Sequence, residues 1–361
     1  MANQKTKDAK NRLAILVTGG AGYIGSTIAL LLVQRGYFVV VVDHRNQATF
    51  PLRFILSSEH GVYVQSDIAN RTLIQHVCVT YNIIACIHCA AFIEVGESVK
   101  QPQAYYNNNV IKSIQLIDTL RAAGVKKIMF SSSCAVYGKP QYMPLDEQHP
   151  KNPISPYGRT KLIVESVLQD YAQAYGIQYG ILRYFNAAGA LPDYWLGERH
   201  DPETHLIPCA LRAAYTQQPF TIFGSDYQTL DGTCVRDYLH IADLADAHCK
   251  TLEYLLATPE SIICNLGTGS GYSVQQVLQT IETVTGYSIK KIYAPRRAGD
   301  PDTLVASAAH AMQLLGWKPQ RALHEIITSA HQFHQLVYET TNQNKTIASL
   351  TKDDIPLGDR V

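Results

Sequence analysis

A glycine-rich turn, TGGAGYIG at residues 18–25, constrains the fold of this chain more than any other feature. It follows a short apolar run, LAILV at 13–17, and opens a segment, STIALLLVQRG, with helical spacing of apolar residues. Its glycines Gly19, Gly22 and Gly25 permit a tight turn, let backbone amides approach a pyrophosphate and let helix pack against strand. Strand, glycine turn and helix in this order predict a dinucleotide-binding unit.

Short apolar runs alternate with amphipathic segments through the first half of the chain. The runs expected as strands after the first one lie at 38–42, 62–64, 83–88, 127–130 and 180–184. Segments with helical periodicity lie near 70–81, 102–123 and 157–175. Continuous apolar strands separated by helices are typical of a parallel sheet covered on both faces. The pattern predicts an α/β fold with a Rossmann-type, doubly wound parallel sheet.

The alternation weakens from about residue 187, where a polar stretch rich in Pro, Gly, Asp, Glu and His begins. Beyond it, short strands and loops are mixed with helical patterns near 206–217, 242–257, 273–285 and 307–314. This indicates a smaller, mixed α/β substrate domain whose loops face the first domain. The expected divisions are a nucleotide-binding domain at 12–187 with a returning segment near 236–264, a second domain at 188–235 and 265–338, and flexible tails at 1–11 and 340–361.

Charge and composition narrow the class of protein. The net charge of +1 and the pI of about 7.6 give no electrostatic basis for binding nucleic acid or a membrane surface. The N-terminal MANQKTKDAKNR is polar and basic, without the apolar region of a signal peptide. No apolar run approaches the roughly 20 residues that span a bilayer. We therefore expect a cytoplasmic protein.

Cysteine and histidine usage predicts no metal site. The eight cysteines are scattered, as expected of thiols in a reducing compartment. Cys86 and Cys89 are spaced C-x-x-C, but they lie in the apolar run IIACIHCAA and have no second ligand pair with zinc spacing, so we interpret them as structural. His331 and His334, three residues apart in a C-terminal helical pattern, are predicted to lie on a solvated helix face.

Asp43 supports the dinucleotide interpretation because it ends the second apolar run, eighteen residues beyond Gly25. An acid there can hydrogen-bond both ribose hydroxyls of NAD and repels the 2′-phosphate of NADP. A turn acid would explain Asp43 but not its register with the glycines. Arg45 nearby softens the preference for NAD. Asp67, after the third run, is placed to meet the adenine, although by itself it reads as a loop residue.

A second group of polar residues follows the run KIMF. Ser131, Ser132 and Ser133 stand at the carboxyl end of a predicted strand, where open α/β sheets bind ligands. The next helix begins with SPYGRTK, which sets Tyr157 four residues before Lys161 and hence on the same helix face. Alone, the pair would be ordinary surface residues. Together with a serine hydroxyl at a strand end and a dinucleotide-binding turn, however, Tyr157 and Lys161 predict hydride transfer at a carbinol carbon.

Lys161 has a physical role in this prediction. A free tyrosine titrates near pH ~10, so a phenolate base at neutral pH needs its pKa lowered by about three units, or ~4 kcal/mol. An ammonium one helical turn away and the positive charge of oxidised nicotinamide both stabilise the phenolate. This explains the spacing of Tyr157 and Lys161 better than chance does.

The chain resembles the extended short-chain dehydrogenase/reductases, and within them the UDP-glucose 4-epimerase family. The resemblance runs in family order from residue 13 to about 335. It rests on TGGAGYIG, GESVKQPQAYYNNNV, FSSSCAVYG, SPYGRTK, LRYFNAAGA, THLIP, DGTCVRDYLH and APRRAGDP. The motifs of the second half are specific to nucleotide-sugar epimerases. The resemblance implies NAD as cofactor, a UDP-sugar as substrate and a homodimer formed through the helices near 102–121 and 157–175.

The resemblance also implies roles for single residues. Ser133, Tyr157 and Lys161 would be catalytic and would act at the 4-hydroxyl of the sugar. The positions expected to bind NAD are Gly19, Gly22, Tyr23, Ile24, Gly25, Asp43, Asp67, Ile68, Asn108, Tyr157, Lys161 and Phe185. The positions expected to bind the UDP-sugar are Ser133, Tyr157, Asn186, His205, Leu206, Thr221, Phe223, Arg236, Arg297 and Asp300. Two arginines suit a diphosphate, because guanidinium offers paired donors to phosphate oxygens, although Arg236-Asp237 also reads as an ion pair and Arg296-Arg297 as a solvated turn.

Five positions depart from the best-known bacterial pattern. Cys89 and Ile93 replace a Phe and a Lys that reach the cofactor there, and this bears on how tightly NAD is retained. His44 and His205 each replace an Asn, one after the ribose-binding acid and one on the uridine loop. Leu304 stands where a tyrosine or a small residue gates larger sugars, so acceptance of N-acetylated sugars stays open.

The sequence therefore predicts an NAD-dependent enzyme that inverts C4 of a UDP-hexose, interconverting UDP-galactose and UDP-glucose through a 4-keto sugar that turns in the pocket. The nearest alternative is 4-epimerisation of another UDP-sugar, such as an N-acetylhexosamine, a pentose or a uronic acid. A 4,6-dehydratase fits less well, because an acid pair follows the active serine there and Cys134-Ala135 follow it here. A non-catalytic NAD-binding protein would be expected to lack the Ser133, Tyr157 and Lys161 set.

Overall fold

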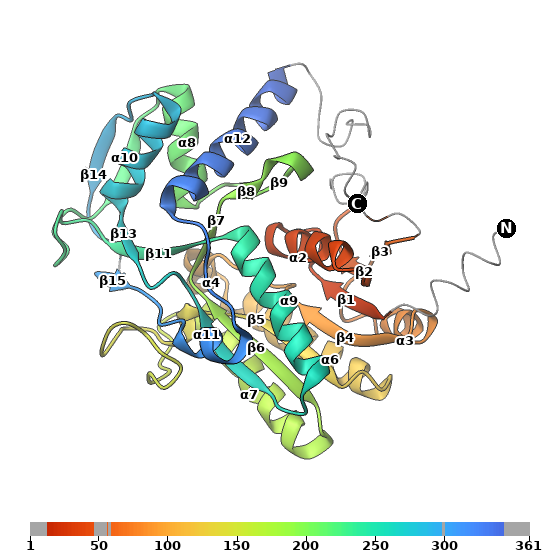
Figure 1. Ribbon diagram of the computed structural model, residues 1–361. Helices are drawn as coiled ribbons and strands as arrows, with labels where there is room; N and C mark the ends of the chain where they lie inside the picture. The colour runs from red at the N-terminus through yellow and green to blue at the C-terminus, as the bar shows by residue number, and fades with distance from the viewer. Residues whose placement is uncertain (1–12, 47–55, 57–58, 298–299, 343–361) are drawn as a thin grey trace.

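A computed structural model describes residues 13–46, 56, 59–297 and 300–342 of the chain. The predicted tail at 1–11 and most of the tail at 340–361 lie outside these residues, whereas 340–342 form the end of the last helix, α12 (Leu323–Asn342). Figure 1 shows a larger lobe around one sheet and, beside it, a smaller lobe of short strands and helices.

The larger lobe is built on a seven-stranded sheet in the order β12-β6-β5-β4-β1-β2-β3, with every neighbouring pair parallel. All five residues of β1 are buried, because helices cover both faces of the sheet. This confirms the predicted doubly wound fold. The strands are β1 (Ala14–Thr18), β2 (Phe38–Asp43), β3 (Gly61–Gln65), β4 (Ile83–His88), β5 (Lys127–Ser133), β6 (Gln178–Tyr184) and β12 (Ile262–Leu266).

Alternate side chains of these strands enter two separate cores. Ile15 and Val17 of β1 pack into one core with α2 (Tyr23–Gln34), α9 (Ile241–Ala257) and α11 (Ala309–Leu315). Ala14 and Leu16 face the opposite core, which contains α3 (Arg71–Thr80), α6 (Lys112–Ala122) and α7 (Pro156–Tyr175). Because successive side chains of a strand point to opposite faces, one apolar run fills both cores. Short helices α4 (Val95–Lys100) and η4 (Cys134–Val136) flank this lobe.

The segment predicted as one helix over 102–123 is divided. It begins as α5 (Pro102–Tyr105), widens to a π-helix, η3 (Tyr106–Ile111), and continues as α6. Within the π-helix, the buried side chain of Asn109 accepts a hydrogen bond from the Phe92 amide at 2.8 Å and donates one to the Phe92 carbonyl at 2.9 Å. Such π-turns frequently mark functional sites.

The smaller lobe is a mixed α/β layer. Its central strand β11 (Val235–His240) runs parallel to β7 (Asn186–Ala188) and β15 (Thr303–Leu304) and antiparallel to β13 (Gly271–Ser273). A second pair joins β10 (Phe220–Phe223) to β14 (Lys291–Ala294) in parallel. Helices α8 (Leu206–Thr216), α10 (Val274–Thr285) and α12 enclose the core of this lobe. Between the lobes lie β8 (Ala190–Leu191), η5 (Pro192–Tyr194) and β9 (Leu196–Gly197).

The prediction of a solvated face for His331 and His334 is wrong. Both side chains are only partly exposed, since α12 packs against α8. The ring of His331 lies 2.7 Å, Nδ1 to Oη, from Tyr215 of α8. Burial lowers the pKa of His334 to about 4, so this imidazole is neutral at physiological pH.

Candidate active site

The glycine turn at the end of β1 has the shape that its sequence requires. Gly19 adopts φ +71°, which favours glycine, and its carbonyl accepts a hydrogen bond from the Gly22 amide at 3.0 Å. A Cβ on Gly25 would lie 2.4 Å from the Gly19 oxygen, so no larger residue fits there. Gly22 caps α2 without a side chain. The amides of the first turn of α2 are therefore available to an anion such as a pyrophosphate.

Asp43 is brought to this turn by the pairing of β2 with β1. Its buried carboxylate accepts hydrogen bonds from the amides of Ala21 and Arg45, both at 3.0 Å. The guanidinium of Arg45 donates to the Ala21 carbonyl at 3.2 Å, while His44 is largely exposed. An acid fixed beside the glycine turn is the arrangement that recognises a ribose next to a bound pyrophosphate.

The other predicted cofactor residues lie on several elements. Tyr23 of α2 donates from its hydroxyl to the Gly189 carbonyl at 2.6 Å and thereby links the two lobes. Asp67, just after β3, pairs with Lys112 at 2.5 Å. Burial acts to raise the pKa of Asp67, but Lys112 outweighs it and the pKa is lowered. Ile24, in the first turn of α2, is partly buried, and Ile68 and Phe185 are buried. The side-chain amide of Asn108 donates to Asn109 at 3.1 Å.

Tyr157 is brought next to Ser133 by the way α7 begins. Ser155 caps the helix by accepting a hydrogen bond from the Gly158 amide at 3.1 Å, and Pro156 takes the first position. A Cβ on Gly158 would lie 2.4 Å from the Ala135 carbonyl. The glycine inside SPYGRTK therefore lets α7 approach the end of β5, a role that the sequence analysis did not assign to it.

Lys161 is almost fully buried, at 3 % exposure, behind Tyr157. Its ammonium donates to the Ser131 carbonyl at 2.7 Å and lies 4.8 Å from the ring centre of Phe130 and 5.8 Å from that of Tyr157. Burial lowers the pKa of Lys161 to about 8. The lysine thus remains a cation at neutral pH, although burial destabilises its charged form.

In the protein without cofactor, Lys161 does not by itself lower the pKa of Tyr157. Burial raises the pKa of Tyr157 to about 12, and the hydrogen bond with Ser133 offsets only part of that increase. The phenol is consequently protonated at neutral pH. An additional positive charge is needed before Tyr157 can act as a base.

A buried polar network fixes α7 on the sheet. Glu165 of α7 receives two hydrogen bonds from the guanidinium of Arg183 in β6, at 3.0 and 2.7 Å, and one from the Ser132 hydroxyl at 2.5 Å. Arg183 also donates to the Tyr137 hydroxyl at 2.9 Å, which donates to Asn265 of β12 at 2.6 Å. Glu165 and Arg183 cannot be identified from sequence, because nothing local marks them as paired.

A second polar chain lies behind Lys161. The Ser131 hydroxyl is 3.3 Å from the sulfur of Cys89 and 3.0 Å from Nε2 of His248, whose Nδ1 donates to the Leu244 carbonyl at 2.9 Å. Burial lowers the pKa of His248 to about 4, so the ring is neutral. Cys86 is fully buried in β4, as the interpretation of the C-x-x-C spacing as structural predicts. Ile93 is 40 % exposed.

A pocket of about 620 Å³ lies in the smaller lobe. Five predicted substrate residues line it, namely Leu206, Thr221, Phe223, Arg297 and Asp300. The guanidinium of Arg297 stands 4.3 Å over the ring of Phe223. Cationic and aromatic groups at one pocket suit a ligand that carries both a phosphate and a base.

Two other predicted substrate residues are engaged within the protein. Arg236 of β11 forms an ion pair with Asp300, not with Asp237 as its sequence neighbour suggested. The amide of Asn186 donates to the Asp237 carbonyl at 2.9 Å and joins β7 to β11. Leu304 lies in β15 directly opposite Arg236 and packs near Phe185. His205 stands at the start of α8 among acidic residues.

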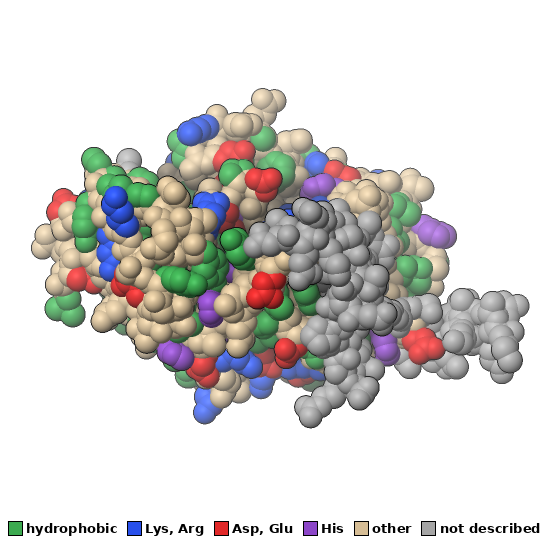
Figure 2. Space-filling model, turned by 90° about the horizontal axis from the view of Figure 1, so that it is seen from above, with side chains coloured by type: hydrophobic (Ala, Val, Ile, Leu, Met, Phe, Trp, Pro, Cys, Tyr) green, Lys and Arg blue, Asp and Glu red, His purple; other side chains and the backbone are tan. Residues whose placement is uncertain are grey.

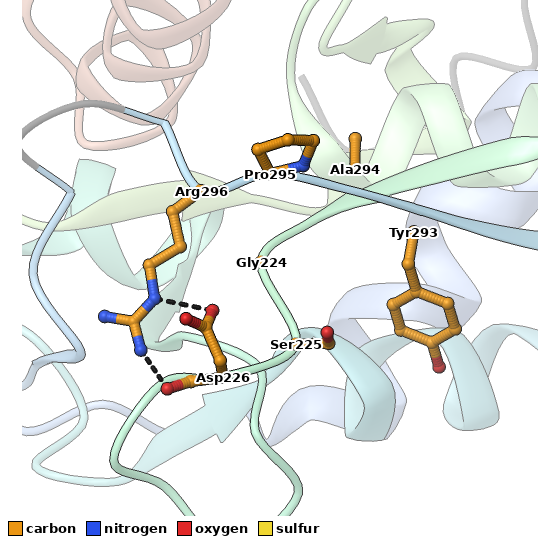
Figure 3. Close-up of a pocket in the computed structure, with 7 residues that line it drawn as sticks. All are labelled: Gly224, Ser225, Asp226, Tyr293, Ala294, Pro295 and Arg296. Carbon is orange, nitrogen blue, oxygen red and sulfur yellow. Dashed lines mark hydrogen bonds and ion pairs between the residues drawn. The ribbon is translucent and has the colours of Figure 1, made fainter.

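A shallower hollow adjoins the end of β10 (Figure 3). Its lining residues are Gly224, Ser225, Asp226, Tyr293, Ala294, Pro295 and Arg296. Arg296 donates to the Asp226 carboxylate at 2.7 Å and also contacts the Asp226 carbonyl. The two adjacent arginines therefore differ: Arg296 is held at the rim by an acid, while Arg297 reaches the larger pocket.

Lys, Arg, Asp and Glu side chains are interspersed on the face seen in Figure 2, as a net charge near zero implies. Among the described helices, none has the length and apolar character needed to cross a membrane.

The fold and the site together define a dinucleotide-dependent enzyme of the short-chain dehydrogenase type. A family model, the NAD dependent epimerase/dehydratase family, matches residues 15–267, and the chain belongs to that family. The chain is 49 % identical to a UDP-glucose 4-epimerase of Rhizobium leguminosarum bv. trifolii over 89 % of this chain and 97 % of the relative. It is 45 % identical to that of Halalkalibacterium halodurans over 92 % of this chain and 100 % of the relative.

Solved structures agree with these relatives. The UDP-glucose 4-epimerase of Brucella ovis in complex with NAD superposes with a TM-score of 0.83 at 44 % identity, covering 88 % of this chain and 97 % of that one. The Bifidobacterium longum enzyme in complex with NAD+ and UDP gives a TM-score of 0.83 at 34 % identity, covering 92 % and 99 %.

The burial of Lys161 predicts a pH-dependent stability difference. The folded pKa of about 8 lies below the ordinary value of 10.5, so the unfolded chain holds the extra proton between these pH values and stability rises with pH there. Lys161→Met removes this penalty. At pH 7 the variant should be more stable in urea unfolding by up to about 3 kcal/mol, and the gap should close between pH 8 and 10.5. A gap that is absent, or constant with pH, would contradict the assignment.

Proposed function

We propose that this protein is an NAD-dependent 4-epimerase of UDP-hexoses that interconverts UDP-galactose and UDP-glucose. The observation that carries the proposal is the placing of Ser133, Tyr157 and Lys161 together at one edge of the sheet. The names of relatives at up to 49 % identity support the same reaction.

The residues present fit a bound dinucleotide. The uncapped first turn of α2, the close approach at Gly25 and the carboxylate of Asp43 would hold the pyrophosphate and a ribose of NAD. When bound, NAD+ supplies a hydride acceptor and a positively charged ring, and as NADH it supplies the hydride donor. The net redox change is zero, so the cofactor stays with the enzyme through the cycle.

Substrate binding is assigned to the smaller lobe. Arg297 and Arg236 would bind the diphosphate, with Phe223 offering an aromatic face to the base. Asp300 keeps Arg236 in place and balances its charge before substrate arrives. Inverting one centre needs the sugar to present both faces in turn. We therefore assign the tight binding to UDP and a looser fit to the hexose.

Proton transfer is assigned to Tyr157. Its phenolate accepts the proton of the sugar 4-hydroxyl as C4 is oxidised, and the phenol returns that proton as C4 is reduced. Ser133 hydrogen-bonds the same oxygen, and Lys161 supplies a buried positive charge that favours the phenolate. Because the pKa of Tyr157 is about 12 in the cofactor-free protein, the tyrosine becomes a base only when a further positive charge is bound.

Two structural observations bear on the alternatives. Cys134 and Ala135 follow Ser133, where a 4,6-dehydratase carries acids, and Cys134 begins the short helix η4. Leu304 lies beside Arg236 and packs near Phe185, next to the region assigned to the sugar. A leucine at this position lacks the hydroxyl of a tyrosine. It also leaves less room for the sugar than a small residue would. We therefore propose unmodified hexoses as the principal substrates.

A conversion assay tests the reaction and its base together. Wild-type protein with added NAD should convert UDP-galactose to UDP-glucose. Tyr157→Phe should reduce turnover by at least about 100-fold, as expected for the loss of a general acid–base, and should retain UDP binding in calorimetry. Absence of conversion by the wild type would overturn the reaction, whereas full activity of the variant would overturn only the role of Tyr157.

We also propose a homodimer. Exposed apolar side chains lie on α4, η3 and α7, which pack side by side, and these are Val95, Val99, Ile111 and Ile163, at 47, 63, 50 and 37 % exposure. A group of exposed apolar side chains on neighbouring helices is typical of an interface. Contact between two such faces would bury them.

The dimer proposal is tested by changing that face. Light scattering of the wild type should give the mass of two chains, and the double variant Val99→Glu, Ile111→Glu should give the mass of one, because buried unpaired carboxylates oppose association. Leu230→Glu is the matched control, since Leu230 is fully exposed in a loop of the smaller lobe and should leave the dimer intact. A dimeric double variant would place the interface elsewhere.

A cytoplasmic location completes the proposal. All eight cysteines are free thiols, and four of them are buried, as suits a reducing compartment.

A further inference from the structure

A histidine–glutamate cluster lies outside the residues used above for catalysis. It consists of Glu198, His200, Glu203 and His205, all within the segment GERHDPETH between β9 and α8. The rings of His200 and His205 lie 4.7 Å apart, centre to centre. Four groups that can ligate a metal thus come from nine consecutive residues.

Both histidines direct the same ring nitrogen toward the same carboxylates. Nδ1 of His205 lies 3.3 Å from Oε1 of Glu198 and 2.8 Å from Oε1 of Glu203. Nδ1 of His200 lies 3.9 Å from Oε1 of Glu198 and 3.4 Å from Oε2 of Glu203. Ligand atoms on a tetrahedral zinc ion, with bonds of roughly 2.0–2.2 Å, are roughly 3.3–3.5 Å apart. The donor atoms are therefore close to metal-ligand spacing.

Glu203 differs from the other three residues because its carboxylate is engaged by the backbone. Its Oε2 accepts from the His200 amide at 3.0 Å, and its Oε1 accepts from the amides of Thr204 and His205, both at 2.9 Å. Glu203 therefore shapes the loop that carries the two imidazoles, because its carboxylate holds three backbone amides.

His200 lacks the partner that a buried polar atom normally has, and Glu198 has only histidines beside it. Glu198 is 7 % exposed, and its carboxylate lies 3.3 Å from Nδ1 of His205 and 3.9 Å from Nδ1 of His200. Nδ1 of His200 is buried without a hydrogen-bond partner among the described residues. If His205 is protonated at Nδ1, it can interact with the carboxylates of Glu198 and Glu203. Nδ1 of His200 would still have no hydrogen-bond partner. A dication held by both rings and by Glu198 satisfies all three groups.

We propose that Glu198, His200 and His205 form a binding site for a divalent transition metal of the zinc type, with Glu203 as a positioning residue. Two imidazoles and one carboxylate are a ligand set typical of zinc, which leaves a fourth position for water. The site adjoins the substrate pocket, because Thr204 and Leu206 line that pocket and His205 is the cap of α8. The metal fixes the loop that begins this wall of the pocket.

Zinc binding by the untagged, full-length protein tests this proposal. After treatment with EDTA, equilibrium dialysis against ZnCl₂ should show one tightly bound zinc per chain, while MgCl₂ should show none, because magnesium prefers oxygen ligands. The double variant Glu198→Gln, His200→Ala should bind zinc at least ~100-fold more weakly, since outer partners alone are worth about 10–100-fold. Glu203→Gln should weaken zinc binding by less than the double variant does, because it disturbs the loop without removing a proposed ligand.

A matched control comes from another group of possible ligands, Glu147, Cys264 and His310. Nδ1 of His310 already donates to the Ile263 carbonyl at 2.9 Å, so His310→Ala should leave zinc binding unchanged. Circular dichroism of the metal-free variants should match the wild type. Wild-type protein without stoichiometric zinc, or a double variant that binds zinc as the wild type does, would overturn the proposal. Loss of zinc from His310→Ala would do so as well.

Discussion

The buried pair of Glu165 and Arg183 is the interaction on which the position of the proposed catalytic residues depends. Tyr157, Lys161 and Glu165 follow one another at intervals of four residues and so lie on one face of α7. Each meets one serine of β5: Tyr157 bonds Ser133, Lys161 bonds the carbonyl of Ser131, and Glu165 bonds Ser132. The bidentate bond to Arg183 fixes the register of this face on the sheet.

Such a buried ion pair adds little net stability, because removing both charges from water offsets most of their attraction. Its contribution here is geometric. A helix held only by apolar contacts could slide or rotate slightly, and a small displacement is costly where a proton must pass between positioned atoms. The same tight packing buries Lys161 and Tyr157, which raises the pKa of the phenol and lowers that of the ammonium. In the proposed reaction, Tyr157 therefore becomes a base only when a further positive charge is bound.

Much of the fold was predictable from sequence because its signals are local. The apolar runs, the glycine turn and the register of Asp43 with it each depend on neighbours in the chain, and the structure places them as expected. The π-helix at η3 was not predictable from helical periodicity, and the bond that its Asn109 makes with Phe92 joins residues distant in sequence. Burial of His334, the pairing of Glu165 with Arg183 and the pKa of Tyr157 likewise depend on segments distant in sequence. The serine, tyrosine and lysine of the site were predictable, but the groups that hold them were not.

The central claim is that C4 of the sugar exchanges a hydride while Tyr157 moves only the hydroxyl proton. Conversion of UDP-galactose that carries deuterium at C4, in ordinary water, tests it most directly. Mass spectrometry and NMR of the product should find the deuterium retained at C4 of UDP-glucose, because a hydride held in the site does not exchange with solvent. Loss of the deuterium to water would contradict the account, since it would mean that C4 is inverted by removal of a proton.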